Sequence, residues 1–234
     1  MRLYLLQYGL GGDGTPIPGY LIRADDGTNI LVDTGFPASA IGTNPFADLV
    51  VKPEDHVLHQ IGVAGLTAAD IHSLLCTHFD FDHAGAHDLF TSAECVVQRR
   101  HWDLAHDGVT TRFDRYRAQW DHPGLRYRMV DGDTTLVPGV ELLDTSGHVI
   151  GHQSVLVRLA GAGPVLLAID AAPSLTQFDP ATYQPSQYDM DVSAAQASIQ
   201  KMNDVRAREG VKLTICGHDS RQWAMLRKAP AYYE

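Results

Sequence analysis

Four side chains that can bind a metal ion fall within six consecutive positions, His78, Asp80, Asp82 and His83. Imidazole and carboxylate groups together suit a divalent ion such as Zn, Mn, Fe or Co. A lone histidine or aspartate in a loop is more often a surface group or a cap, but four in one short run indicate a metal site. Because alternate side chains of an extended segment point apart, the run must turn, and a turn can present His78 and Asp80 to one ion and Asp82 and His83 to another. The pattern favours a metal-dependent hydrolase.

The segment before this run is the first element that must position it. Residues 71–77 are mainly apolar and predict a short buried strand that ends at the polar Thr77. The four side chains therefore lie on a loop at the carboxyl end of a strand. Open α/β sheets usually place their functional sites at that end of their strands.

Three later segments repeat this arrangement of an apolar strand beside polar ligands. A turn-rich segment contains His148 and His152, and one of these two histidines is expected to complete the first metal site. A second apolar run ends in Asp170, a carboxylate that can bridge two cations. A third is followed by a glycine and His218. The three segments are residues 144–154, 164–170 and 211–219.

Four motifs carry a resemblance to a known family. They are HFDFDHAG at 78–85, SGHVIGHQS at 146–154, AIDAA at 168–172 and CGHD at 216–219. In order and spacing they resemble the successive metal motifs of the metallo-β-lactamase superfamily. The N-terminal part agrees, since residues 18–22 and 29–35 resemble the paired strands and the DTG turn that open that fold. The resemblance covers nearly the whole chain and implies an α/β fold, a four-layer αββα sandwich with metal ions at one edge between its two sheets.

Within the superfamily the chain is most similar to the N-acyl homoserine lactonases. This likeness lies in DHAG at 82–85, in CVVQRRHWDLA at 95–105 and in the terminal GHD. It implies a hydrolase that opens a lactone or cleaves an ester, with an N-acyl homoserine lactone as the expected substrate and quorum quenching as the expected role. The cofactors implied are two divalent metal ions, with zinc expected and manganese, iron or cobalt as alternatives.

Carried over residue by residue, the resemblance implies a complete ligand set. One ion would be held by His78, Asp80 and His148, the other by Asp82, His83 and His218, and Asp170 would bridge them. Asp80 departs from the family pattern, because the usual HxHxDH is HxDxDH in this chain. An oxygen ligand at this position would make the first site harder and more anionic, or it would leave that metal weakly bound or absent. The HxExDH variant of flavodiiron proteins also has a carboxylate here, so the identity of the metal stays open.

A second departure concerns the residue that contacts the substrate. In the lactonases a tyrosine three residues after the bridging aspartate commonly contacts the substrate carbonyl, but this chain has Pro173 there. Tyr183 or Tyr188, farther along the same segment, can take its place, and we take Tyr188 as the catalytic candidate. The competing interpretation is that each tyrosine only packs or faces solvent.

The chemistry expected of this site is hydrolysis without a serine nucleophile, since the chain has no GxSxG motif. Two cations that share Asp170 would activate a water molecule for attack on an ester or lactone carbonyl. Asp82 would be a ligand that also carries a proton to the leaving alkoxide. Three alternatives stay open: a di-iron redox protein related to the flavodiiron metal domain, a glyoxalase II-like thioesterase, and a non-catalytic metal-binding or sensor protein.

Length and composition fit one globular domain over residues 1–234. Hydrophobic residues make up 44% of the chain and charged residues 20%, so global disorder is not indicated. The net charge of −10 argues against nucleic-acid partners and against anionic membranes. One local basic group is the exception, and we interpret it as a solvated helix face. It comprises Arg99, Arg100, His101, Arg112, Arg115 and Arg117.

Cysteine usage and the N-terminal residues predict a cytoplasmic protein. Cys76, Cys95 and Cys216 form no CxxC pair and lie in or beside apolar runs, as expected of buried thiols in a reducing compartment. The apolar run within residues 1–8 is too short for a signal peptide, and no apolar stretch approaches the length of a membrane span.

The hydrophobic pattern predicts the elements between the motifs. Strands are expected near 2–8, 18–23, 28–33, 72–77, 94–98, 139–143, 153–159, 164–169 and 212–216. Helices are expected at 66–71, 99–107, 112–119 and 191–208, the last with a cap at Asp191 or Ser193. Two long segments, 35–62 and 173–190, are expected to shape the substrate pocket, because long loops over a rigid site often act as lids. Their apolar side chains suit an acyl chain and would equally suit the interface of a homodimer.

Overall fold

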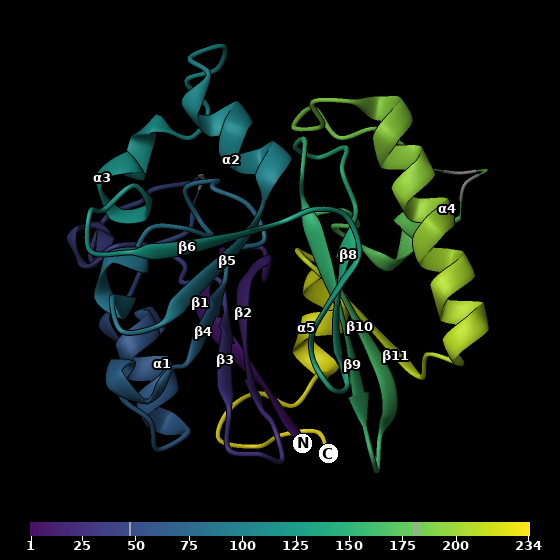
Figure 1. Ribbon diagram of the computed structural model, residues 1–234, viewed down its shortest axis with the longest axis horizontal. Helices are drawn as coiled ribbons and strands as arrows, with labels where there is room; N and C mark the ends of the chain where they lie inside the picture. Colours follow the sequence, from purple (N-terminus) through teal and green to yellow (C-terminus); the bar gives the residue numbers. More distant parts are fainter. Residues whose placement is uncertain (47, 180, 182) are drawn as a thin grey trace.

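Two β-sheets packed face to face form the centre of the protein, as seen in a computed structural model (Figure 1). The structure describes residues 1–46, 48–179, 181 and 183–234. The two sheets come from the two halves of the chain, and helices cover the outer face of each.

The first sheet has six strands that lie in chain order. They are β1 (Arg2–Leu10), β2 (Pro16–Arg23), β3 (Asn29–Val32), β4 (Ser73–Leu75), β5 (Glu94–Gln98) and β6 (Arg126–Val130). Strands β1 to β3 are antiparallel, whereas β3 to β6 are parallel. Parallel strands end at the same edge of a sheet, so the loops after β3 and β4 begin beside each other.

The second sheet has five strands in the order β11-β10-β9-β8-β7. Their bounds are β7 (Thr134–Val137), β8 (Val140–Asp144), β9 (Gln153–Leu159), β10 (Gly163–Ile169) and β11 (Leu213–Cys216). Strands β10 and β11 pair in parallel. Their parallel direction brings the residues that follow them, Asp170 and His218, to one edge of the sheet.

The helices complete a four-layer arrangement. They are α1 (Val57–Val63), α2 (Arg99–His106), α3 (Arg117–Trp120), α4 (Val192–Glu209) and α5 (Ser220–Met225). Figure 1 shows α1, α2 and α3 on the outer side of the first sheet and α4 on the outer side of the second. The carboxylate of Asp191 caps α4 by accepting a hydrogen bond from the backbone N–H of Ala194. The predicted αββα sandwich and the predicted cap are both confirmed.

Three apolar cores lie between these four layers. Leu3 and Leu5 of β1 belong to the core between the sheets. Tyr4 and Leu6, which alternate with them, belong to the core under the helices of the first half. A third core joins the second sheet to α4 and contains Ile199. Because both faces of β1 are covered, its sequence is apolar almost throughout, although it lies at the edge of its sheet.

The structure differs from the predicted elements where local patterns are weak. Strands β6 and β7 are missed, because β6 alternates arginines with apolar residues at a sheet edge and β7 is short and half exposed. The predicted loop 35–62 contains α1, which is held by the buried Val57 and Ile61. The predicted helices 66–71 and 112–119 shorten to a 3-10 turn at Ala68–Asp70, and to the 3-10 turn Asp114–Tyr116 followed by α3. Helix α5 is also missed.

Two further expectations concern the whole chain. The three cysteines are buried and unpaired, as predicted. None of the helices in the described part of the chain is long and apolar enough to cross a bilayer.

Candidate metal centre

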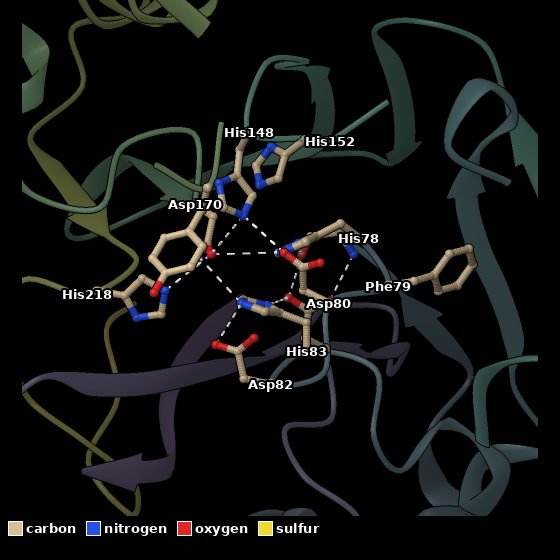
Figure 2. A network of polar contacts seen from close by, with 12 residues as sticks. His78, Phe79, Asp80, Asp82, His83, His148, His152, Asp170 and His218 are labelled. Atoms are coloured by element: carbon tan, nitrogen blue, oxygen red, sulfur yellow. Dashed lines mark hydrogen bonds and ion pairs between the residues drawn. The ribbon is translucent and has the colours of Figure 1, made fainter. Parts of the chain in front are cut away.

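The side chains predicted to bind metal meet at one edge of the two sheets, where four segments of the chain converge (Figure 2). The first segment is the loop after β4, and the others precede β9, follow β10 and follow β11. Two groups have ligand atoms that all lie within 4.8 Å of one another. They are His78, His148 and Asp170, and Asp82, His83 and His218.

The first group has the spacing of a metal site, with Asp80 beside it. Oδ2 of Asp170 lies 3.8 Å from Nε2 of His78 and 3.4 Å from Nε2 of His148. Oδ2 of Asp80 lies 3.3 Å and 3.1 Å from the same two nitrogens. Ligands about 2.0–2.1 Å from a tetrahedral zinc ion would lie about 3.3–3.4 Å apart. The contacts of both carboxylates with these histidines are close to that spacing.

Asp170 also faces the second group, so it lies between the two. Its Oδ1 is 3.5 Å from Nε2 of His83, and its Oδ2 is 3.1 Å from Nε2 of His218. Oδ2 of Asp82 lies 3.7 Å from Nε2 of His83. A carboxylate with one group on each side is placed to bridge two cations.

Several of these atoms are buried without a hydrogen-bond partner. They are Nε2 of His78, Nε2 of His83 and Oδ1 of Asp170. A buried polar atom left without a partner costs about 1–3 kcal/mol. Cations between these atoms would satisfy all three. The residues present therefore fit divalent metal ions that prefer nitrogen and oxygen ligands.

A neighbouring group holds the other ring nitrogen of each of the four histidines. Nδ1 of His78 lies 3.0 Å from Oγ1 of Thr77, and Nδ1 of His218 lies 2.9 Å from the carbonyl oxygen of Pro16. The other two pairs are His83 with Asp33 at 2.8 Å and His148 with Asp189 at 3.6 Å. Such contacts fix the ring so that Nε2 faces the site.

Burial and neighbouring charges shift the pKa values of His78 and His148 in opposite directions. Burial lowers the pKa of His78 to about 3, so its ring is neutral and has a lone pair for a metal. Burial also acts against a charge on His148, but its contacts with the carboxylates of Asp189 and Asp80 outweigh burial and raise its pKa to about 9. When no cation is bound, a proton on His148 offsets part of the negative charge of the site.

A positively charged side chain, that of Arg112, contacts the first group of candidate ligands. Nε of Arg112 donates to Oδ1 of Asp80 at 2.7 Å, and Nη2 donates to Oδ2. Nη2 also lies 2.9 Å from Nε2 of His148. Burial acts to raise the pKa of Asp80, but hydrogen bonds led by that from Arg112 lower it well below its usual range. The interpretation of Arg112 as part of a solvated face is wrong, because its side chain is only 21% exposed and points into the site.

The rest of the predicted basic face divides between surface and core. Arg99 and Arg100 are exposed, as expected, and pair with the exposed Asp131 and the partly buried Asp144. His101 is buried, and its Nε2 accepts a hydrogen bond from the backbone N–H of Phe79 at 2.8 Å. Its Nδ1 contacts the carbonyl oxygen of Ile150 at 2.9 Å. His101 thus ties α2 to two of the loops that carry ligands.

A cavity of about 260 Å³ opens over the candidate ligands. Phe46, Phe81 and Ile17 give it apolar walls, and Pro173 and Tyr188 lie on the same lining. Phe46 belongs to the long segment 35–62, and the last two belong to 173–190. Both segments shape the pocket, as predicted.

The two candidate tyrosines have different surroundings. Tyr188 lines the cavity as an exposed residue, and the centre of its ring lies 6.5 Å from that of Phe46. Tyr183 is buried, and its hydroxyl donates to Asp189 at 2.7 Å. Tyr183 therefore supports the carboxylate beside His148, whereas Tyr188 faces the cavity.

The sequence patterns missed three residues that contact the candidate ligands, namely Asp33, Arg112 and Asp189. A signal existed for Asp33, because it directly follows β3 in the DTG turn just as Asp170 follows β10. Arg112 and Asp189 lie outside the helices and strands, so no periodic pattern marks them.

Comparison with protein families identifies the family of the chain. The family model described as the Metallo-beta-lactamase superfamily matches residues 12–218. An N-acyl homoserine lactonase from Bacillus sp is 32% identical over 226 residues, which cover 93% of this chain and 86% of that relative.

Solved structures agree with the fold over almost the full length. A variant of AiiA from B. thuringiensis, with N-decanoyl-L-homoserine at its active site, is 28% identical with a TM-score of 0.85, and covers 99% of this chain and 98% of that one. An N-acyl homoserine lactone hydrolase with N-hexanoyl-L-homoserine at its catalytic metal centre is 29% identical, with the same TM-score and coverage. From its motifs, its sandwich fold and its clustered ligands, the chain belongs to the metallo-β-lactamase superfamily, and within it is related to the N-acyl homoserine lactonases.

Proposed function

We propose that the protein is a metal-dependent N-acyl homoserine lactonase, which opens the lactone ring of a quorum-sensing signal and so inactivates it. One observation carries the proposal: two groups of histidine and aspartate ligand atoms share Asp170 at the floor of an apolar-walled cavity. The related lactonases support the choice of substrate, because one of them holds a ring-opened product at its catalytic metal centre.

The ligand set supports a centre for two divalent ions, with zinc as the first choice and manganese, iron or cobalt as alternatives. When bound, such ions supply Lewis-acid chemistry and activate water. The first would be held by His78, Asp80 and His148, and the second by Asp82, His83 and His218, with Asp170 between them.

The chain itself would bind and orient the substrate. The apolar side chains of Ile17, Phe46 and Phe81 line the cavity and would receive the acyl chain. Tyr188 lines the same cavity, and its hydroxyl would donate a hydrogen bond to the lactone carbonyl oxygen. This donor would favour the transition state, in which charge develops on that oxygen.

Asp82 is placed to move a proton. It lines the cavity, and burial raises the pKa of its carboxyl group. A carboxylate with a raised pKa takes up a proton more readily near neutral pH. We assign to Asp82 the transfer of a proton to the alkoxide that leaves when the ring opens.

The test is hydrolysis of lactones by the full-length protein, stripped of metal and reloaded with Zn²⁺ or Mn²⁺. Proton release would be followed with N-hexanoyl and N-decanoyl homoserine lactones, with an aryl ester and a glutathione thioester alongside. We expect lactone hydrolysis that a chelator abolishes and added metal restores. Asp82→Asn should lose most of this activity, whereas Asp131→Asn, at an exposed carboxylate that pairs with Arg99, should keep it.

Two results would overturn the proposal. A preference for the thioester would favour the glyoxalase II-like alternative. Two iron atoms with oxygen consumption and no hydrolysis would favour the redox alternative.

A further inference from the structure

The Arg112 guanidinium contacts atoms on which the first metal site depends. Its Nε and Nη2 donate to the two carboxylate oxygens of Asp80, and its Nη2 lies 2.9 Å from Nε2 of His148. These oxygens and this nitrogen are the ligand atoms that Asp80 and His148 would offer to an ion. One side chain therefore engages two of the four proposed ligands of the first site.

The position of this side chain is set by other contacts. Nη1 of Arg112 donates to the carbonyl oxygens of Tyr188 and His148, the latter at 3.4 Å. The next residue, Phe113, is buried, and its carbonyl oxygen accepts a hydrogen bond from Nε1 of Trp120 at 3.0 Å. The guanidinium thus has acceptors on several sides, and its backbone is anchored in the core.

The negative charge of Asp80 explains why a positively charged side chain lies beside it. At position 80 the family pattern HxHxDH has a histidine, which is neutral when it binds a metal, and this chain has a carboxylate. Asp80 adds one negative charge beside Asp170, and the guanidinium of Arg112 adds one positive charge in contact with it. A buried carboxylate without such a partner would carry a large desolvation cost.

The second site has no comparable competitor. Among the described residues, the ion pairs of Asp82, His83 and His218 are with other members of the site and with Asp33. No arginine or lysine of the described chain pairs with them. Among the described residues, a cation entering the second site therefore displaces no arginine or lysine side chain.

We propose that Arg112 is a built-in competitor of the first metal ion: its guanidinium binds Asp80 and lies in contact with Nε2 of His148 until an ion displaces it, so the two sites fill unequally. The second site binds tightly, and the first binds weakly because a divalent ion there meets a guanidinium at close range in a poorly solvated site. The inference rests on the proposed two-metal centre but not on the identity of the substrate.

The test is metal binding without substrate. The metal-free full-length protein would be titrated with Zn²⁺ by competition with a chromophoric chelator, and with Co²⁺ followed by its visible absorption. We expect one tight equivalent and a second that is weaker by about 100-fold. His218→Ala should remove the tight equivalent, and His148→Ala should remove the weak one.

Arg112→Met decides the role of the arginine, because methionine keeps an unbranched side chain and removes the charge. We expect it to strengthen the weak equivalent by about 10-fold or more while the tight one stays unchanged. The unchanged tight site reports that the variant is folded. Asp80→His combined with Arg112→Met, which restores the family pattern, should bind two equivalents tightly.

Two results would overturn the proposal. The unmodified protein could bind two equivalents with equal affinity, or Arg112→Met could weaken the first site, which would make the arginine a support of Asp80 rather than a competitor. Neither result would contradict the proposed lactonase activity. Conversely, if the two sites bound metal with unequal affinity but the protein hydrolysed no lactone, only the proposed function would be wrong.

Discussion

Oδ2 of Asp33 lies 2.8 Å from Nδ1 of His83 at the floor of the candidate metal centre. The same carboxylate accepts hydrogen bonds from the hydroxyl of Thr77 at 2.6 Å and from its backbone N–H at 2.8 Å. An ionised carboxylate can only accept hydrogen bonds, so Nδ1 of His83 carries a proton. Asp33 therefore directs Nε2 of His83 toward the site and selects the tautomer that can bind a metal.

Asp33→Asn should weaken metal binding at the second site by about 10- to 100-fold. An amide N–H facing Nδ1 of His83 would favour the tautomer with its proton on Nε2, which cannot bind a metal. The affinity would be measured by competition with a chelator. Tyr8→Phe is a matched control, because the Tyr8 hydroxyl donates to the backbone carbonyl of Asp33 at 3.1 Å and leaves the carboxylate alone. Unchanged affinity in Asp33→Asn would show that His83 needs no such partner.

Asp189→Asn should act on the first site alone. The Asp189 carboxylate lies 3.6 Å from Nδ1 of His148 and accepts hydrogen bonds from the Tyr183 hydroxyl and the Ser186 N–H. Loss of its charge should weaken the first site by about 10-fold, as seen when outer-shell partners of metal ligands are removed. A Co²⁺ titration separates the two sites. Tyr183→Phe, which keeps the carboxylate, should have a smaller effect, and equal weakening of both sites in Asp189→Asn would contradict this assignment.

Tyr188→Phe should lower kcat/KM for lactones by about 10-fold or more without changing metal content, if its hydroxyl stabilises the developing oxyanion. The reason is that Tyr188 lines the cavity, whereas Tyr183 is buried with its hydroxyl already bonded to Asp189. Steady-state rates and elemental analysis would be measured on both Tyr188→Phe and Tyr183→Phe. A catalytic defect confined to Tyr183→Phe would reverse the assignment.

Acid should destabilise the fold through His101. Burial lowers its pKa to about 4 in the folded protein, whereas an unfolded histidine has a pKa of about 6.5. The unfolded chain therefore binds the proton first as pH falls, and stability present above about pH 6.5 is lost progressively toward pH 4. Between pH 7 and pH 5 this histidine should cost about 2 kcal/mol of unfolding free energy.

His101→Gln tests this linkage, because glutamine can still accept a hydrogen bond from the Phe79 N–H. Urea unfolding at pH 7 and pH 5 should show a smaller loss of stability in the variant than in the unmodified protein. An equal loss in both proteins would place the acid sensitivity elsewhere, for example at the buried His87, whose pKa burial lowers to about 3.

Much of the fold follows from local patterns of apolar residues, because the hydrophobic effect drives these residues out of water. Alternation in β1 places Leu3 and Leu5 on one face and Tyr4 and Leu6 on the other, and both faces are buried. The pattern fails where an element depends on its neighbours. The short helix α1 contains a glycine and is held by burial of Val57 and Ile61. The edge strand β6 carries the exposed Arg126 and the half-buried Arg128.

The sequence by itself determined which ligands the centre has and where along the chain they lie, because metal chemistry restricts residue types and strand ends restrict spacing. Only the tertiary structure decided which other side chains orient those ligands and which side chain competes with a metal ion for them. Asp33 reaches His83 across 50 positions and Arg112 reaches Asp80 across 32, each through contacts between two side chains. Such contacts depend on how separate loops are brought together by packed sheets, and neither hydrophobic period nor motif spacing records that arrangement.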